Sequence, residues 1–372
     1  MLVTFLRDFI EDGRTSMEGY SDNLVAQLSE RHSDEFAIRE FRPVLGRAAL
    51  LPDALNLRMR VARYVSYPQQ VRRLGNGGVF HILDHGYAHL MSVIDPRRTV
   101  LTVHDIIPIL AGRGLIAGLP SMRRNWLAEW TATFYRRAAR IVADSESTKN
   151  DLIRFCACDP GRIDVIHPGV DPAYRPLEAA ERLAARQVLG LPVDDKLVLV
   201  IGGAYYKNHA TSVRVMARLS TRLERLRLVY LGGPSRHWDD AVRGSSIRDS
   251  VIELPFVRPA QMVQLYNAVD CLLFPSWYEG FGLPPLEAMA CGTPAVTSSS
   301  ASLPEVGGDT ALTAAPDDIE QLALHVERLL NDSQFRAAVV DRGLQQRQRF
   351  DWAQGCSRLA EIYRQVEGSR AA

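Results

Sequence analysis

Two glutamates, Glu279 and Glu287, flank a glycine-rich loop in the second half of the chain. The loop follows an apolar run at residues 271–274, typical of a buried strand, and it precedes two prolines that favour the first turn of a helix. Backbone N–H groups and the helix dipole attract anions at such a helix start. Gly280 and Gly282 would let a diphosphate approach the backbone closely. A carboxylate beside that phosphate would hold sugar or ribose hydroxyls.

The stretch that begins at Glu279 reads Glu-Gly-Phe-Gly-Leu-Pro-Pro-Leu-Glu-Ala-Met-Ala-Cys-Gly-Thr-Pro. It resembles the donor-site signature of retaining glycosyltransferases with the GT-B fold, in family 4. The resemblance implies that Glu279 holds donor-sugar hydroxyls or stabilises positive charge on the sugar, and that Glu287 binds the ribose hydroxyls. It also implies that a run of backbone N–H groups stabilises the donor diphosphate, namely those of Gly280, Phe281, Gly282 and Leu283.

A lysine follows a second apolar run, at residues 196–201, and lies in the loop that ends at Asn208. The charge of this residue, Lys207, would neutralise a diphosphate. The resembling family commonly places both an arginine and a lysine there. Gly203 and Tyr206 occupy the positions near the expected arginine, so the source of a second positive charge stays open.

Polar residues also follow the apolar run at residues 99–103, where α/β folds bind ligands past the carboxyl ends of parallel strands. His104 and Asp105 stand there in a Val-His-Asp-x-x-Pro pattern that resembles the acceptor-domain motif of the same family. The resemblance implies that His104 reaches the donor sugar near its reacting carbon and that Asp105 shapes the acceptor side. The alternative for His104 is a buried histidine bonded to the backbone. His85 and His89 are further candidates beside the acceptor.

The first loop, at residues 11–20, precedes a helix expected from about Ser21. In the resembling family this loop is rich in glycine and lies against the donor phosphates. Gly19 is its best match here, although the usual glycine pair is absent. The alternative is a plain turn glycine.

Composition bounds the class of protein. The chain has 372 residues, 47% hydrophobic and 23% charged, with a formal net charge of +1. This length suits two α/β domains, and the charge gives no general attraction to nucleic acid. Five cysteines without a Cys-x-x-Cys pair favour reduced thiols and a cytoplasmic location. The sequence shows neither a signal-peptide pattern nor an apolar run long enough to span a membrane.

The periodicity predicts alternating strands and helices, hence parallel sheets. The expected strands are residues 2–6, 36–41, 79–83, 99–103, 140–145, 163–166, 196–201, 226–231, 251–254, 271–274 and 294–297. We expect the GT-B fold, with two Rossmann-like domains facing a central cleft. The first domain, residues 1–172, would bind the acceptor, and the second, residues 173–352, the nucleotide sugar. A terminal helix, residues 353–372, would pack back on the first domain.

Two segments suggest a contact with membranes. Five arginines and no acidic residue lie between Arg58 and Arg73, as either a solvated basic face or a patch for anionic lipid or a phosphorylated lipid acceptor. A predicted amphipathic helix at residues 121–140 places Trp126 and Trp130 on one face, either in the core or at a membrane interface. If the basic segment binds lipid and the helix lies at a membrane interface, the protein would be cytoplasmic and located at the inner face of the cell membrane.

The expected activity is retaining transfer of a hexose from a nucleotide diphosphate sugar to a saccharide or lipid-linked saccharide acceptor, in the synthesis of bacterial surface polysaccharide. GDP-mannose is favoured over UDP-sugars because the His-Asp-Ile-Ile-Pro form resembles bacterial mannosyltransferases. No metal or other cofactor is expected, since no Asp-x-Asp motif suited to a divalent ion is evident. Lys207 and the loop N–H groups would stabilise the leaving diphosphate instead. The alternatives are a nucleotide-sugar 2-epimerase of the same fold and a non-catalytic sugar-nucleotide-binding protein.

Overall fold

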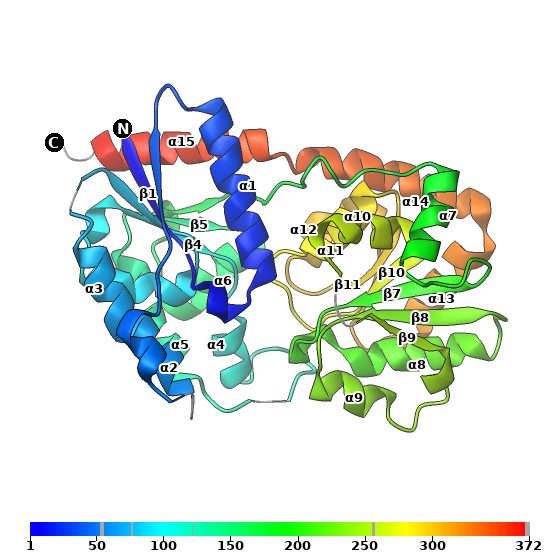
Figure 1. Ribbon diagram of the computed structural model, residues 1–372. Coiled ribbons are helices and arrows are strands. Elements are labelled where there is room, and N and C mark those ends of the chain that lie inside the picture. Colours follow the sequence, from blue (N-terminus) through cyan, green and yellow to red (C-terminus); the bar gives the residue numbers. More distant parts are fainter. Residues whose placement is uncertain (53–55, 76, 121, 255–256, 369–372) are drawn as a thin grey trace. The chain divides into compact units, whose positions relative to one another are not determined.

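The computed structural model describes residues 1–52, 56–75, 77–120, 122–254 and 257–368 (Figure 1). The chain divides into two compact units. Unit 1 comprises Met1–Arg113, Met122–Gly169 and Asp351–Ala372, and unit 2 comprises Gly114–Ser121 and Val170–Phe350. Residues 114–121, which we expected in the first domain, therefore group with unit 2. There, Gly118 has a φ of +77° and lies directly against the ring of Trp277, where a side chain would not fit.

Unit 1 is built on a six-stranded parallel sheet with the order β2-β1-β3-β4-β5-β6. The apolar runs predicted from the sequence form these strands because helices cover both faces of the sheet, so strands such as β3 and β4 are buried along their whole length. The strands are β1 (Leu2–Leu6), β2 (Ala37–Phe41), β3 (Val79–Ile82), β4 (Thr99–Val103), β5 (Arg140–Ala143) and β6 (Ile163–Val165).

Helices and short turns connect these strands. The helices of unit 1 are α1 (Thr15–Arg31), α2 (Leu57–Val61), α3 (Tyr67–Arg72), α4 (Ile107–Gly112), α5 (Trp126–Ala132), α6 (Glu146–Cys156) and α15 (Trp352–Gly368). The short turns are η1 (Ile10–Asp12), η2 (Gly46–Leu50), η4 (Ala62–Ser66), η5 (His85–Ser92), η6 (Pro96–Arg98), η7 (Tyr135–Arg137) and η8 (Pro160–Arg162). Figure 1 shows α15 beside α1. The hydroxyl of Tyr363 on α15 lies 2.6 Å from Nδ1 of His81 on β3.

Two helix predictions in unit 1 were wrong in their bounds. The first helix begins at Thr15 rather than near Ser21, because Arg7 and Arg42 both bind Glu18 and hold its first turn. Glu18 also lies at the helix end where the dipole favours negative charge.

The helix expected over residues 121–140 is only α5, with Asn125 as its N-cap. It ends where the hydroxyl of Thr133 donates to the carbonyl oxygen of Trp130 at 2.7 Å, a bond that competes with the helical ladder. Residue 121 lies outside the described part of the chain.

Unit 2 has a second six-stranded parallel sheet, with the order β12-β11-β10-β7-β8-β9. Hydrophobic clusters cover both of its faces. The edge strand β12 was missed, because three residues are too few to show a period. The strands are β7 (Lys196–Ile201), β8 (Leu226–Leu231), β9 (Val251–Leu254), β10 (Cys271–Phe274), β11 (Ala295–Ser298) and β12 (Leu312–Ala314).

The helices of unit 2 are α7 (Ala179–Val188), α8 (His209–Ser220), α9 (Arg236–Val242), α10 (Pro259–Ala268), α11 (Leu283–Ala290), α12 (Leu303–Gly307), α13 (Ile319–Asn331) and α14 (Ser333–Gln346). Its short turns are η9 (Tyr205–Lys207), η10 (Arg248–Ser250), η11 (Gly308–Thr310) and η12 (Arg347–Arg349). Two Rossmann-like α/β units confirm the predicted fold class. Among the described residues, no helix is long and apolar enough to cross a membrane.

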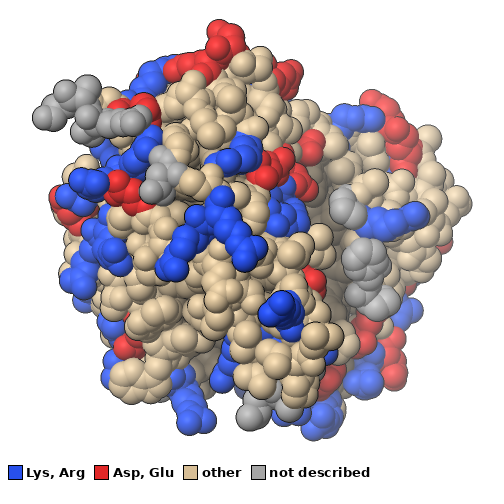
Figure 2. Space-filling model, turned by 60° about the vertical axis from the view of Figure 1, so that its left-hand side comes forward, with Lys and Arg blue, Asp and Glu red and all other residues tan. Residues whose placement is uncertain are grey.

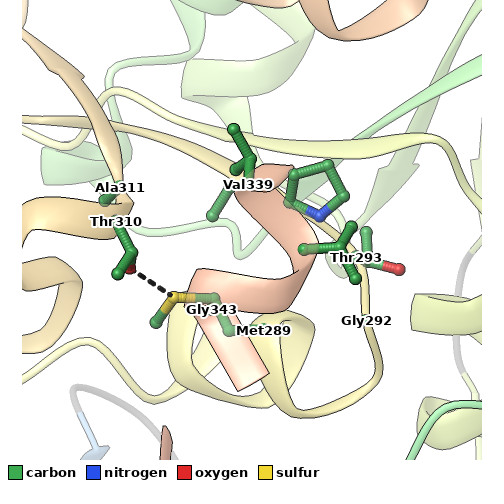
Figure 3. A pocket seen from close by; sticks show the side chains of 10 residues that line it. Met289, Gly292, Thr293, Thr310, Ala311, Val339 and Gly343 are labelled. Atoms are coloured by element: carbon green, nitrogen blue, oxygen red, sulfur yellow. Dashed lines mark hydrogen bonds between the residues drawn. The ribbon is translucent and has the colours of Figure 1, made fainter. Parts of the chain in front are cut away.

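The helix that follows the glycine loop, α11, packs closely against α14. Gly343 on α14 makes room for Met289, because a Cβ at Gly343 would come within 3.3 Å of the Met289 side chain. Figure 3 shows the narrow crevice between these helices, where the Thr310 hydroxyl lies 3.7 Å from the Met289 sulfur. The crevice offers no volume to a water molecule. The contact with α14 therefore fixes the position of α11.

Candidate functional site

The glycine loop has the predicted geometry of strand, loop and helix. Gly282 precedes α11 with a φ of +120°, a backbone conformation that favours glycine. The Ser302 hydroxyl lies 2.9 Å from the carbonyl oxygen of Glu279 and 2.6 Å from that of Phe281, so it holds the loop in place. At the other end, Gly292 has a φ of +71° and its N–H donates to Met289, which confirms its predicted place just past the helix.

The contribution of this loop to a ligand comes from its backbone. The Phe281 side chain packs with Phe350 in a hydrophobic cluster beneath the loop, with ring centroids 5.6 Å apart. Pro284 and Pro285 have no N–H groups, so the second and third residues of the helix offer no donors. Donors at this helix start must come from Leu283 and the residues before it.

Lys207 and Glu279 meet at this loop. The Lys207 ammonium lies 2.8 Å from Oε1 of Glu279, and the two side chains are only 12% and 10% exposed. The same ammonium stands 4.4 Å from the ring centroid of Phe274. The structure therefore brings together two of the three residues predicted to be catalytic, in a largely desolvated ion pair.

Asn208 fixes the segment that carries Lys207. Its φ is +57°, and its side-chain amide donates to the carbonyl oxygens of Pro275 and Pro316 at 3.0 and 2.7 Å. The first bond links this segment to the end of β10, and the second links it to the residues that follow β12. The next residue, His209, is buried, and burial followed by the charge of Lys207 lowers its pKa to about 4. His209 is therefore neutral near pH 7 and supplies no second positive charge.

Glu287 lies one turn into α11 and is held by two tyrosines. The Tyr266 hydroxyl donates to its Oε2 at 2.7 Å, and Tyr174 also donates to this carboxyl group. Burial raises the pKa of Glu287 to about 7, although both tyrosine hydroxyls act in the opposite direction. This carboxyl group therefore changes charge near neutral pH.

In unit 1, His104 is buried at the carboxyl end of β4. Its Nδ1 donates to Asp144 at 2.6 Å and its Nε2 donates to the carbonyl oxygen of Leu83 at 2.9 Å. Burial alone would lower the pKa of His104, but the Asp144 carboxylate overrides it and raises the pKa to about 9. His104 is thus a fixed imidazolium with both N–H groups engaged. A bond from Nε2 to a donor sugar would have to replace the bond to Leu83.

The same edge of the sheet carries carboxyl groups that the sequence analysis did not select. Asp8 follows β1 and Asp84 follows β3, and Arg14 forms an ion pair with Asp84. Burial, and then the charge of Asp84, raises the pKa of Asp8 to about 8. Within the described part of the chain, Oδ2 of Asp8 and Oδ1 of Asp144 have no hydrogen-bond partner. The rule used for His104, polar residues just past parallel strands, would have found all three aspartates.

The remaining predicted residues have local roles in the structure. Asp105 accepts from the N–H of Ile107, the first residue of α4, at 2.8 Å. His85 is half-buried beside Asp84, and Nε2 of His89 lies 2.9 Å from the carbonyl oxygen of Arg63. Gly19 is not in a loop, because α1 already includes it, and a Cβ there would meet nothing within 4 Å. The expectation that Gly19 lies in a loop was wrong, and its contact with the donor phosphates stays a prediction.

Sequence analysis also missed the residues that support the donor-side groups. Three of these residues lie 20 or more positions from the groups they hold, namely Tyr174, Tyr266 and Ser302, so sequence spacing carries no signal for them. Asn208 is the neighbour of Lys207, but its bonds reach Pro275 and Pro316.

Two family descriptions match the chain. "Glycosyl transferases group 1" matches residues 181–346, and "Glycosyltransferase Family 4" matches residues 23–174. Among solved structures, sucrose-phosphate synthase from Thermosynechococcus elongatus is similar to this chain with a TM-score of 0.77 at 18% identity. The similarity covers 99% of this chain and 100% of that one. It concerns the fold.

Curated relatives match over part of the chain. A D-inositol 3-phosphate glycosyltransferase from Kineococcus radiotolerans is 34% identical over 258 residues, which are 63% of this chain and 59% of the relative. The O-antigen chain mannosyltransferase B of Escherichia coli is 30% identical over 232 residues, 61% of each chain. The chain thus spans about three fifths of the length of these relatives.

Proposed function

Because the chain belongs to family 4 of the GT-B glycosyltransferases, we propose that it transfers a hexose from a nucleotide diphosphate sugar to a saccharide or lipid-linked saccharide acceptor. The observation that carries the proposal is the desolvated Lys207–Glu279 pair at the start of α11, with Glu287 one turn into the helix. One cation for a diphosphate and two carboxyl groups for hydroxyls are the groups that a nucleotide sugar requires.

Each of these groups has a separate task in the proposed reaction. The Lys207 ammonium and the dipole of α11 stabilise negative charge on the leaving diphosphate. Glu279 accepts hydrogen bonds from the sugar hydroxyls and stabilises positive charge on the ring, and Glu287 accepts from the ribose. The anomeric configuration is retained, as the resemblance to retaining enzymes implies. No divalent ion is required, so activity should persist in EDTA.

The names of the relatives support a choice of substrates to test. One relative is an O-antigen chain mannosyltransferase, which supports GDP-mannose as the first donor and UDP-sugars as the next. Another acts on D-inositol 3-phosphate according to its name, which supports acceptors that carry a phosphate. On the acceptor side, unit 1 holds buried carboxyl oxygens of Asp8 and Asp144 that have no hydrogen-bond partner among the described residues.

A thermal-shift screen tests the donor site. A nucleotide at about 100 times its dissociation constant should stabilise the folded protein by about 2.7 kcal/mol, which raises the melting temperature by about 5–10 °C. GDP, UDP, ADP and TDP are compared, each with and without its sugar. We expect one base to stand out and its effect to disappear in Lys207→Ala and Glu287→Ala.

A surface variant serves as the control for this screen. Arg243→Gln removes an exposed arginine of unit 2 and should keep the full shift. If no nucleotide shifts any of these folded proteins, the donor-site assignment is wrong. A separate activity assay tests the reaction itself. Retaining transfer would be established if nucleotide is released only in the presence of an acceptor and if the anomeric configuration of the product matches that of the donor.

A contact with anionic membranes is a further part of the proposal. The aromatic segment predicted from the sequence is exposed, because Trp126 is 68% and Trp130 45% exposed on α5. Tyr64 lies 5.8 Å from Trp130 between ring centroids, so the basic segment from α2 to α3 is adjacent to this helix. Figure 2 shows basic side chains interspersed with neutral surface on the face of unit 1 that bears α2 and α3.

Vesicle co-sedimentation tests this contact. Trp126→Ala with Trp130→Ala should strongly weaken binding to vesicles that contain phosphatidylglycerol, and Arg124→Gln should weaken it about fivefold, since one arginine near such a surface contributes about 1 kcal/mol. Leu324→Ala, which changes an apolar residue that is 54% exposed on α13 of unit 2, is the control. Equal binding by all variants would contradict the proposed surface.

A further inference from the structure

Unit 1 contains a pocket at the amino ends of its strands, at the opposite edge of the sheet from His104. The pocket has a volume of about 490 Å³, which lies within the range of about 300–1,000 Å³ for small-molecule sites. Four of the seven residues that line it are arginines and none is acidic; the lining residues are Arg97, Arg137, Ala139, Arg140, Arg162, Gln365 and Val366.

The position of these arginines follows from the chain topology. Three short turns, η6, η7 and η8, lead into β4, β5 and β6, and each of them carries one arginine of the pocket, while Arg140 is the first residue of β5. The N–H of Ala139 lies 2.9 Å from the carbonyl oxygen of Pro96 and 3.0 Å from that of Thr99, which joins two of the turns. Val366, on α15, is buried and closes one side. The base of the pocket is therefore fixed by the sheet.

The charges around the pocket are not fully balanced. Arg97 pairs with Asp95 at 2.9 Å, and Nε of Arg140 donates to Asp164 at 2.9 Å. Asp164 is shared, because Arg358 also binds it at 3.0 Å.

The two other arginines are held more loosely. Arg162 lies 3.8 Å from its aspartate, Asp159. Arg137 has no acidic partner within the described residues, and its guanidinium stands 5.3 Å from the ring centroid of Phe134. Like charges gathered around one cavity repel each other, and a bound anion removes that repulsion.

We propose that this pocket binds a phosphate-bearing anion at a site separate from the reaction chemistry. A planar guanidinium group can donate two parallel hydrogen bonds to two oxygens of one phosphate, which suits a ligand with a phosphate or diphosphate group. The strand β4 separates the pocket from His104 by its five residues, roughly 16 Å of extended chain. A ligand here would leave the donor groups of unit 2 unoccupied, so the site is suited to an effector or an anchoring headgroup.

Titration calorimetry with inorganic pyrophosphate tests the pocket. The whole protein carries Lys207→Ala, so that the donor site does not contribute. We expect one binding event whose dissociation constant rises at least tenfold when Arg137→Gln and Arg162→Gln are added. Arg31→Gln, an exposed arginine of α1 bonded to Gln27, is the matched control and should leave the constant unchanged.

The same variants separate the two sources of the phosphate. A free anion should bind as pyrophosphate does, whereas a lipid headgroup should bind only in vesicles that contain phosphatidylglycerol, tested on protein that carries Trp126→Ala and Trp130→Ala. Binding in either experiment supports the site if the double variant Arg137→Gln with Arg162→Gln abolishes that binding. Absence of binding in both arms, or binding that both arginine variants retain in folded protein, overturns the proposal. Neither outcome bears on the donor site.

Discussion

At the scale of single residues, Glu287 connects the fold to the proposed chemistry. Its carboxyl group would bind ribose hydroxyls, a task for the ionised form, yet burial raises its pKa from 4.5 to about 7. Two tyrosine hydroxyls orient the carboxyl group and favour its ionised form. A neutral Glu287 would offer one fewer acceptor to the ribose. Binding of the nucleotide should therefore depend on pH in a range where other carboxyl groups are already ionised.

We expect nucleotide affinity to rise with pH up to about 7 and then to level off. Below that value, each pH unit should weaken binding by as much as about tenfold, because the carboxyl group must first lose its proton. Since the folded-state pKa is raised, stability of the free protein should fall as pH rises from 4.5 to about 7. Calorimetry at several pH values, on the unchanged protein and on Glu287→Gln, measures the pH dependence of nucleotide affinity.

Glu320→Gln on the exposed face of α13 is the control, because its carboxyl group lies at the surface. This variant should keep the pH dependence, and Glu287→Gln should lose it. An unchanged profile in Glu287→Gln would assign the titration to another group.

At the scale of elements, the segment from β10 to α11 depends on the backbone of Gly282. Its φ of +120° lies outside the range that side chains tolerate, and a Cβ there would come within 2.9 Å of Leu303 on α12. The prolines start α11, and its contact with α14, which leaves no room for a water molecule, holds the helix in place. The loop is therefore preorganised rather than shaped by its ligand.

Gly282→Ala should destabilise the protein by about 2–4 kcal/mol, the sum of backbone strain and the contact with Leu303. Gly244→Ala is a matched control, since Gly244 also has a positive φ, +71°, but open space around it. We expect that control to cost about 1–2 kcal/mol. Urea unfolding measures both. Nucleotide binding should be lost in Gly282→Ala and retained in Gly244→Ala; equal losses in stability would contradict the role of Leu303.

The elements also show what sequence reasoning can reach. Continuous apolar runs such as β4 and β10 were found with their observed bounds, because a parallel strand buried on both faces has no other sequence pattern. The start of α1 was misplaced because it depends on Arg42, which binds Glu18 from 24 residues away.

The same limit applies to the candidate site. Glycines, prolines and glutamates of the donor loop lie close together in the sequence, so their pattern was visible. The bond between His104 and Asp144 spans 40 residues, and it determines the charge of this histidine. Pairings of this kind depend on the order of strands in the sheet, which composition and spacing do not contain.

At the scale of the whole molecule, α15 belongs to the core of unit 1 although the chain reaches it only after unit 2. Tyr363 of this helix is fully buried, and its hydroxyl bonds His81 in the centre of the sheet. The other ring nitrogen of His81 lies 2.8 Å from Thr102 on β4. Burial lowers the pKa of His81 to about 3, so this histidine stays neutral and acts as a bridge between helix and sheet.

Tyr363→Ala should therefore destabilise unit 1 by about 3–5 kcal/mol, and Tyr363→Phe by about 1–3 kcal/mol through the unpaired His81 nitrogen. Hydrogen exchange followed by mass spectrometry resolves where protection is lost. We expect faster exchange in β1, β3 and β4 and unchanged exchange in β7 and β10. Protection lost equally in both sheets would show that α15 stabilises the molecule as one cooperative block.

The place of α15 also sets an order of events during synthesis on the ribosome. Unit 1 starts with the first residues of the chain, but it stays incomplete until residues 352–366 have been translated and have emerged. At about 5–20 residues per second, translation of the intervening unit 2 takes roughly 10–40 s. During that time the face of the sheet that receives Tyr363 lacks its covering helix. Unit 2, whose main segment is continuous, has no such delay, so the half of the protein made second is free to finish folding first.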